Sequence, residues 1–195
     1  MIQSQKFIDA IDLFDKSNEN DPNKESFEGK MLSKELLYAN RMTQCLEKFN
    51  PEAKEALKLA VRCQHLRRWE IPREDYEMNR VGYLKWRNDL KTFHADKASE
   101  ILKEVGYEDD LVESVRFLLL KKQLKQNELT QTLEDVICLV FLEFYFEKFS
   151  AKYSEEKMIN ILQKTWKKMS SKGQKAALEL HFSAHSQGLI SKALS

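Results

Sequence analysis

Apolar residues recur at intervals of three and four along most of this chain, which is the spacing of one face of an α-helix. Phe7, Ile8, Ile11 and Phe14 form such a stripe within residues 3–18. The same periodicity, with capping residues, predicts further helices after Ser33, over roughly 51–68, 79–105, 109–122 and 136–149, and after Ser154 and Ser170. The pattern therefore predicts a bundle of helices joined by short links.

The scarcity of turn-forming residues points the same way. Glycine occurs five times and proline three times in 195 residues, and a many-stranded sheet would need more of both in its turns. We therefore expect an all-α, single-domain helical bundle over residues 1–180. Within it, residues 19–32 are polar and are predicted to form a loop, and residues 181–195 are predicted to be a weakly patterned C-terminal tail.

The charge balance and the lengths of the apolar runs limit the partners and the cellular locations that we expect for this chain. The chain has 32 basic and 31 acidic residues, for a formal net charge of +1, so it has no overall field that favours nucleic acid as a partner. The longest apolar run, residues 136–146, is too short to cross a bilayer. The N-terminus lacks the apolar core of a signal peptide, and three cysteines without CxxC spacing indicate no disulfide framework. We expect a cytoplasmic protein that has no membrane partner.

Candidate chemistry comes from ionisable residues on apolar helix faces. His65 continues the face of Leu57 and Val61, His94 lies on the stripe of residues 90–105, and Asp135 stands at the entrance of the most apolar helix. Neutral imidazole and carboxylate oxygen are ligands for zinc, iron or manganese. With Glu35 as a further oxygen donor, these residues predict a divalent metal site.

Basic and polar residues near these positions suggest what such a site would hold. Gln64, Arg67, Arg68, Arg87 and Lys121 are candidates for binding the anionic part of a substrate, since arginine can hold phosphate with two parallel hydrogen bonds. The expected ligand is a phosphorylated small molecule, such as a nucleotide.

Each metal candidate also has a purely structural explanation. A histidine on an apolar face can be a hydrogen-bonded core residue. Asp135 can cap its helix together with Thr132, whose spacing resembles a capping box, and Glu35 can interact with the dipole of its helix.

Several long segments resemble a known family of uncharacterised proteins. These segments are QHLRRWEIPREDY, NRVGYLKWRNDLKTFHADKASEIL, LEDVICLVFLEFYFEKF and EEKMINILQKTWKKMS. They are similar to domain-of-unknown-function family 4202, and the likeness runs from Phe7 to about Leu180. The family implies no established activity.

A more distant resemblance is to the HD superfamily of helical metal-dependent phosphohydrolases. In this comparison His65 takes the place of the histidine in the His-Asp pair, Asp135 that of the last aspartate, and His94 that of an accessory histidine. The pair itself is broken, because Leu66 follows His65, and Tyr38 stands where the superfamily has its first histidine. Glu35 is the nearest substitute for that ligand.

Two main functions follow from these residues. A third, RNA binding by the clustered arginine and aromatic residues between Arg67 and Arg87, ranks below them because the net charge is nearly zero. The first is a divergent HD-like metal-dependent phosphohydrolase acting on a phosphorylated small molecule, in which His65, His94, Asp135 and Glu35 hold the metal. The alternative is a non-catalytic helical module that binds a small anion, a nucleotide or a partner protein, which the loss of two standard ligands favours. Because a superfamily likeness supports the fold better than the chemistry, both functions remain open at this stage.

Overall fold

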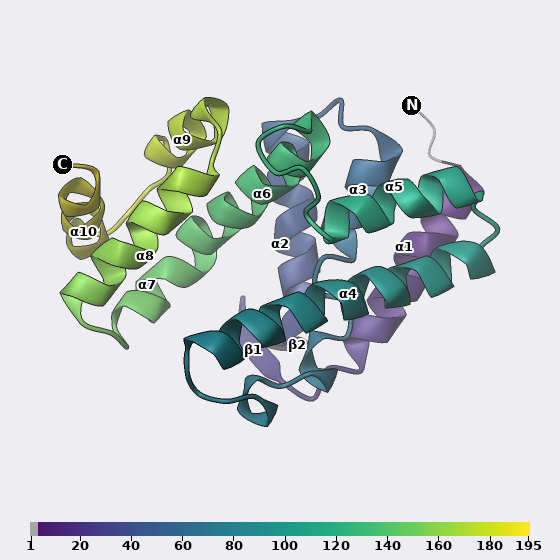
Figure 1. Cartoon of the computed structure of the whole chain (residues 1–195), viewed down its shortest axis with the longest axis horizontal. Helices are drawn as coiled ribbons and strands as arrows, with labels where there is room; N and C mark the ends of the chain where they lie inside the picture. Colours follow the sequence, from purple (N-terminus) through teal and green to yellow (C-terminus); the bar gives the residue numbers. More distant parts are fainter. Residues whose placement is uncertain (1–3) are drawn as a thin grey trace. The chain divides into compact units, whose positions relative to one another are not determined.

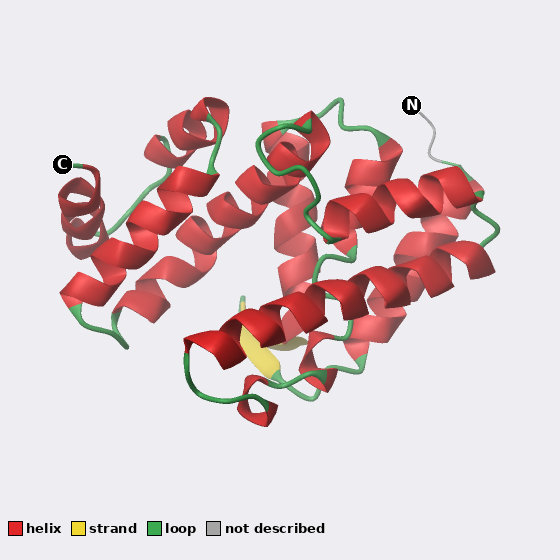
Figure 2. Ribbon diagram, in the orientation of Figure 1, coloured by secondary structure: helices red, strands yellow, loops and turns green. Residues whose placement is uncertain are grey.

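The computed structural model describes residues 4–195, and Figure 1 shows the course of the chain. Within these residues the secondary structure comprises ten α-helices, two short 3₁₀ helices, one π-helical segment and a two-stranded sheet (Figure 2). The prediction of an all-α class is confirmed. The chain divides into two compact units, Met1–Lys122 and Gln123–Ser195, which are described separately below as the N-terminal and C-terminal units. The prediction of one domain over residues 1–180 stays a prediction.

The described part of the N-terminal unit contains five α-helices. They are α1 (Gln5–Glu19), α2 (Lys34–Phe49), α3 (Glu55–Arg62), α4 (Arg80–Glu104) and α5 (Asp109–Leu119). Helix α5 packs on α3 and α4, and α3 packs on α1 and α2. The side chains of Phe14, Met42, Leu57 and Leu102 are fully buried in this core. No helix in the described part of the chain combines the length and apolar character needed to span a bilayer.

The ends of these helices follow from local capping. The side chain of Ser4 accepts a hydrogen bond from the backbone N–H of Phe7 at 3.2 Å, and that of Asn79 accepts one from Gly82 at 2.8 Å. Both bonds satisfy backbone donors that have no partner within the first helical turn. Gly106 follows the end of α4 with φ of +83°, a conformation that glycine adopts without steric cost.

The predicted polar loop over residues 19–32 contains a β-hairpin instead. Strand β1 (Lys24–Phe27) pairs antiparallel with β2 (Lys30–Ser33), and Phe27 lies opposite Lys30. The two residues between the strands, Glu28 and Gly29, have φ of +49° and +76°. A two-residue turn with both central residues at positive φ matches the twist of a hairpin. The prediction of a loop was wrong here because a glutamate at this position is an uncommon turn residue.

The third helix is shorter than its predicted span of 51–68. It ends at Arg62, and the chain continues through turns to Arg67, which adopts a left-handed conformation with φ of +53°. The side chain of Asn18, from α1, accepts a hydrogen bond from the backbone N–H of Arg67 at 3.0 Å. This contact between distant segments stabilises a break that local periodicity does not reveal. Two 3₁₀ helices, η1 (Arg68–Glu70) and η2 (Arg73–Asp75), complete the link to α4.

The C-terminal unit is built on one long helical run. This run comprises α6 (Glu128–Val140), the π-helix η3 (Phe141–Tyr145) and α7 (Phe146–Ser150). Three helices follow: α8 (Glu155–Lys168), α9 (Ser171–Leu178) and α10 (Ala184–Leu194). Helix α10 lies within the predicted weakly patterned tail, residues 181–195, so the tail prediction was wrong for most of its length. Ser183 caps α10, and Leu189 and Ala193 are buried on its inner face.

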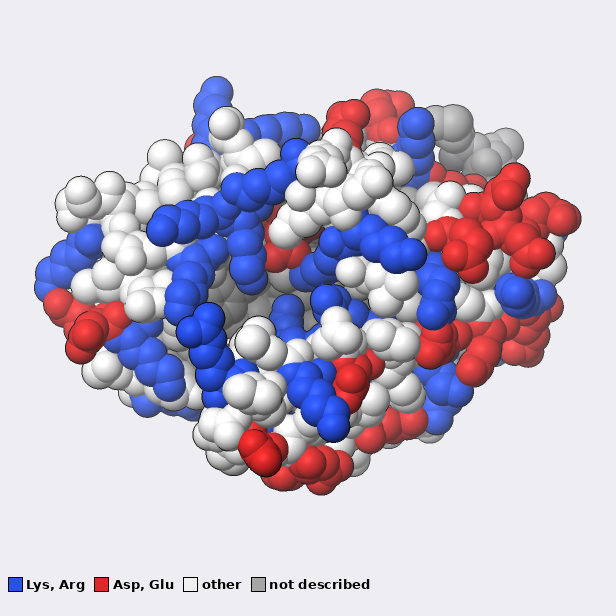
Figure 3. Space-filling view, viewed as in Figure 1, with Lys and Arg blue, Asp and Glu red and all other residues white. Residues whose placement is uncertain are grey.

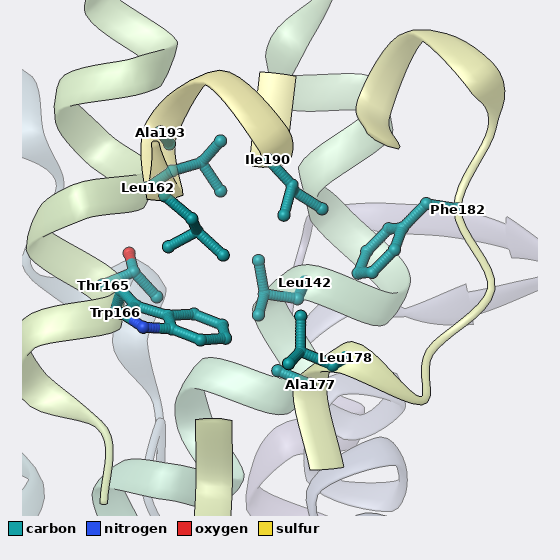
Figure 4. A pocket seen from close by; sticks show the side chains of 10 residues that line it. Leu142, Leu162, Thr165, Trp166, Ala177, Leu178, Phe182, Ile190 and Ala193 are labelled. Carbon is teal, nitrogen blue, oxygen red and sulfur yellow. The ribbon is translucent and has the colours of Figure 1, made fainter. Parts of the chain in front are cut away.

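Apolar side chains hold α10 in place. Figure 4 shows Leu142, Leu162, Phe182 and Ile190 converging from four segments of the C-terminal unit on one small hollow beside Trp166. The hollow has a volume of only about 20 Å³, far below the size of sites that bind organic ligands. We interpret it as the core of this unit rather than as a binding site.

Candidate functional site

Three of the predicted site residues meet in the N-terminal unit. Glu35 extends from the first turn of α2, His65 from the turns after α3, and His94 from the middle of α4. A Glu35 carboxylate oxygen lies 3.1 Å from Nδ1 of His65, and the two imidazole rings have centroids 5.8 Å apart. We call these residues the Glu35–His65–His94 cluster. Glu35 and His94 are buried, and His65 retains 19% of its side-chain exposure, so the cluster reaches the surface at His65.

The hydrogen bonding of His94 defines its protonation. Its Nδ1 lies 2.8 Å from the carbonyl oxygen of Leu66, and since a carbonyl only accepts, Nδ1 must carry the proton. Burial lowers the pKa of His94 to about 3, with nearby His65 acting in the same direction. The ring is therefore neutral, and its Nε2 bears a lone pair. Among the described residues this buried Nε2 has no hydrogen-bond partner.

His65 is held on two sides. The ring of Tyr38 stacks on it with a centroid distance of 4.0 Å and an interplanar angle of 13°, while the Tyr38 hydroxyl donates to Oε1 of Gln64 at 3.3 Å. Burial lowers the pKa of His65 well below its ordinary value, and the neighbouring cations Arg68 and Arg87 lower it further. A neutral His65 that donates from Nδ1 to Glu35 would likewise present Nε2 as an acceptor.

The cluster is surrounded by more positive than negative charge. Nε of Arg68 lies 3.7 Å from the second carboxylate oxygen of Glu35, and its guanidinium stacks over Trp86 at 4.9 Å from the ring centroid. Burial raises the pKa of Glu35, an effect that Arg68 opposes. Arg87 and Lys121 also lie close enough to act on the charge of His65. An anionic ligand would be attracted to this part of the surface.

Tertiary contacts from α1 and the segment after it fix the backbone of the cluster. The buried carboxylate of Asp21 accepts a hydrogen bond from the backbone N–H of Glu35 at 3.0 Å, and Asn18 holds Arg67 as described above. Sequence reasoning missed Asp21 and Tyr38 as members of the site. Tyr38 was detectable in principle, since it lies three residues after Glu35 and so shares its helix face.

The predicted substrate-binding residues divide into two groups. Arg68, Arg87 and Lys121 contact the cluster or influence it electrostatically, and Gln64 accepts a hydrogen bond from Tyr38, which stacks on His65. Arg67 does not belong with them, because its Nε bonds the carboxylate of Glu70 at 2.5 Å and its side chain is 40% exposed. Arg67 therefore contributes its backbone conformation to the site, and its guanidinium is paired elsewhere.

Asp135, the fourth predicted metal ligand, lies in the C-terminal unit, where its carboxylate joins α6 to the corner between α8 and α9. Its oxygens accept hydrogen bonds from the backbone N–H of Ser170 at 2.8 Å, the hydroxyl of Ser170 at 2.5 Å and the amide of Gln131 at 3.1 Å. The predicted helix start at Thr132 was wrong, because α6 begins at Glu128 and is capped by Asn127. Asp135 therefore stabilises the start of α9.

Because Gly173 has no side chain, it leaves room for the Asp135 carboxylate. A Cβ added at Gly173 would lie 2.6 Å from Oδ1 of Asp135, whereas one added at Gly188 in α10 would meet nothing within 4 Å. We expect Gly173→Ala to lower the free energy of unfolding by about 1–3 kcal/mol through overcrowding. Gly188→Ala, the matched control, should raise it by about 0.5–1 kcal/mol, since alanine favours helix. Urea titrations would measure both; equal effects of the two substitutions would contradict the packing assigned to Gly173.

The donor set limits what the cluster can do with a metal. Within residues 4–195, no group of three or more His, Cys, Asp or Glu side chains is arranged to hold one ion. Two imidazole Nε2 atoms could serve as ligands, and the Glu35–His65 pair resembles the way proteins orient metal-binding imidazoles. Water or substrate oxygens would have to complete the coordination. The predicted zinc, iron or manganese site stays a prediction.

Comparison with known proteins places the chain in a family without adding an activity. No curated protein and no solved structure matches it. A match to the family described as "Domain of unknown function (DUF4202)" extends over residues 8–190. This range includes the whole Glu35–His65–His94 cluster and the Asp135 corner, and it agrees with the resemblance found in the sequence. The chain belongs to the DUF4202 family.

Proposed function

We propose that the Glu35–His65–His94 cluster binds a phosphorylated small molecule that also carries a hydroxyl group. The observation that carries this proposal is the buried Nε2 of His94, an acceptor without a hydrogen-bond partner among the described residues. Leaving such an atom unsatisfied costs about 1–3 kcal/mol. A ligand hydroxyl that reached this atom from the exposed side of the cluster, at His65, would supply the missing donor, and a phosphate group has no such donor when fully ionised.

The neighbouring cations would hold the phosphate. Arg68 has a side chain that is 23% exposed, and it is already oriented by Trp86 and Glu35. A guanidinium held in this way loses little freedom when it bonds an oxyanion. Together, Arg68 and Arg87 would select a phosphate group, and His94 would select the sugar or polyol attached to it.

A thermal-shift and calorimetric comparison would test this proposal in the presence of a chelator. Ribose 5-phosphate should stabilise the protein, while ribose and inorganic phosphate should each bind at least roughly tenfold more weakly, because each lacks one recognised group. Arg68→Gln should weaken ribose 5-phosphate binding by about tenfold or more, and the conservative Arg68→Lys should retain part of the affinity. Absence of stabilisation by any phosphorylated probe would refute the proposal.

The second candidate is the divergent HD-like phosphohydrolase, and the proximity of the two imidazole rings, with centroids 5.8 Å apart, supports it. If both Nε2 lone pairs bind one divalent ion, the metal would polarise a phosphoryl oxygen and lower the pKa of a bound water. The same experiment separates the candidates when Mn²⁺ or Zn²⁺ replaces the chelator. Metal-dependent phosphate release that is lost in His65→Ala would support the enzyme, and chelator-resistant binding without turnover would support the binding module.

A further inference from the structure

The C-terminal unit carries a cluster of lysines on two consecutive helices. Between residues 160 and 178 the chain has five lysines and no acidic residue. They are Lys164, Lys167 and Lys168 of α8, and Lys172 and Lys175 of α9, and all five are exposed. In Figure 3, blue Lys and Arg atoms run across the part of the molecule where α8 and α9 lie, with few red atoms among them. We call this surface the α8–α9 lysine face.

The backbone of α8 and α9 beneath this face is held in place by buried residues and by side-chain hydrogen bonds. The Asp135 carboxylate bonds Ser170 at the corner between the helices, and Met169 beside it is 4% exposed. The amide of Gln131 donates to the carbonyl of Lys168 at 2.9 Å, and that of Gln174 donates to the carbonyl of Trp166 at 3.0 Å. The lysine stems therefore start from positions that need no rearrangement on binding, which reduces the entropic cost of association.

The net charge of the whole chain does not reveal this local concentration of positive charge on α8 and α9. The formal value of +1 is an average over the sequence, and acidic residues gather elsewhere, around the end of α4 and the start of α5. Those residues are Glu100, Glu104, Glu108, Asp109, Asp110 and Glu113. The α8–α9 lysine face keeps a local positive field, although Lys168 lies 3.6 Å from the Glu134 carboxylate. Local clusters of this kind attract polyanions even when the whole protein is nearly neutral.

The composition of the face indicates which polyanion it fits. Between Lys164 and Lys175 the exposed residue other than lysine is Ser171, and Leu178, one turn after Lys175, is the exposed large apolar residue of α8 and α9. Membrane-binding helices need several large apolar residues beside the basic ones. Trp166 lines the small apolar hollow and does not offer a platform for base stacking. Lysine ammonium groups bind the phosphodiester groups of a nucleic acid. Without aromatic side chains on which bases can stack, they distinguish little between base sequences.

We propose that the α8–α9 lysine face binds the sugar–phosphate backbone of a nucleic acid, without preference for base sequence. This inference is independent of the function proposed for the Glu35–His65–His94 cluster, because it concerns different residues in the other unit. The binding is electrostatic, so its affinity falls steeply as the salt concentration rises.

Fluorescence anisotropy on the full chain would test the proposal, with a labelled 20-nucleotide single-stranded RNA and a labelled 20-base-pair DNA duplex of unrelated sequences as probes. Both should bind at 50 mM salt, and the triple variant Lys164→Gln, Lys167→Gln, Lys175→Gln should bind at least roughly tenfold more weakly. Its slope of log affinity against log salt should be smaller by about 0.7–0.9 for each phosphate that the variant no longer neutralises.

A triple variant of equal charge change provides the control. Lys16→Gln, Lys48→Gln and Lys54→Gln remove three exposed lysines from the N-terminal unit. This protein should bind the probes within about twofold of the unmodified chain, since these lysines are not part of the α8–α9 lysine face. Equal weakening in both triple variants would overturn the proposal, as would no binding at 50 mM salt. Binding to vesicles containing phosphatidylserine but to neither nucleic acid would overturn it in favour of a membrane surface.

Discussion

Asp135→Ala is expected to lower the free energy of unfolding of the C-terminal unit by about 3–5 kcal/mol, the largest effect of any single change considered. The substitution removes a buried carboxylate that accepts three hydrogen bonds, two of them from Ser170. It leaves the backbone N–H of Ser170 without its acceptor at the start of α9, and it opens a cavity beside Gly173. Urea unfolding followed by circular dichroism in chelator-treated buffer would measure the loss.

Asp135→Asn is the matched control for this prediction. Asparagine keeps an acceptor oxygen of the same shape, so it should retain the bond from the backbone N–H of Ser170 and lose roughly half as much stability. Glu143→Gln, an exposed change in the same unit, should leave stability within about 0.5 kcal/mol. If Asp135→Ala instead left metal-free stability unchanged and abolished metal binding, Asp135 would be a ligand and the structural role assigned to it would be wrong.

Acidification from pH 7 to pH 5 is expected to destabilise the N-terminal unit, with about 2 kcal/mol arising from His94 alone. The folded-state pKa of His94 is about 3, against an ordinary value of 6.5. Below pH 6.5 the unfolded chain therefore binds a proton at His94, whereas the folded chain leaves this imidazole neutral until the pH approaches 3. Stability attributable to His94 is complete above pH 6.5, and it falls by up to about 1.4 kcal/mol per pH unit until the pH approaches 3.

Two neighbours modify the total pH dependence. The lowered pKa of His65 acts in the same direction as that of His94, while the raised pKa of Glu35 acts in the opposite direction, because the folded chain holds the Glu35 proton more tightly than the unfolded chain. The contribution of His94 is therefore best isolated by comparison with His94→Gln, whose amide can still donate to the carbonyl of Leu66.

Urea unfolding at pH 7 and pH 5 would give the difference for each protein. The loss of stability on acidification should be smaller by about 2 kcal/mol in His94→Gln than in the unmodified chain. A double variant of His181 and His185 to glutamine, which changes two exposed histidines, should behave as the unmodified chain does. The same pH dependence with and without His94 would show that its imidazole is not buried in the neutral form.

The helical class was predictable because helix periodicity is a local property of the sequence. Most stripes of apolar residues lie on the helices where the pattern predicted them, and Ser154 and Ser170 cap theirs as expected. The hairpin at residues 24–33 was not predictable in this way. Its turn depends on positive φ at Glu28. An Asn-Gly or Asp-Gly pair usually indicates such a turn, and the turn here has Glu28-Gly29 instead.

The candidate site was predictable only in part, and for a definite reason. His65 and His94 could be placed together, since each extends an apolar face and such faces meet in the core. The break after Arg62 could not be foreseen, because it depends on Asn18 from another helix. The hydrogen bonds that Ser170 donates to Asp135 could not be foreseen either, because Ser170 lies 35 residues later in the sequence, outside the reach of any local pattern.

The contacts that build the Glu35–His65–His94 cluster join segments that are far apart along the chain. The bond between His65 and Glu35 spans 30 residues, that between His94 and Leu66 spans 28, and that between Arg67 and Asn18 spans 49. Closing a loop of this length lowers the entropy of the chain, and the contact offsets this cost only once it has formed. Such pairings are therefore expected to form late in folding. Partly folded chains are therefore expected to contain helices before they contain the imidazole pair, and the Glu35–His65–His94 cluster will be complete only when α1, α2 and α4 have all assembled.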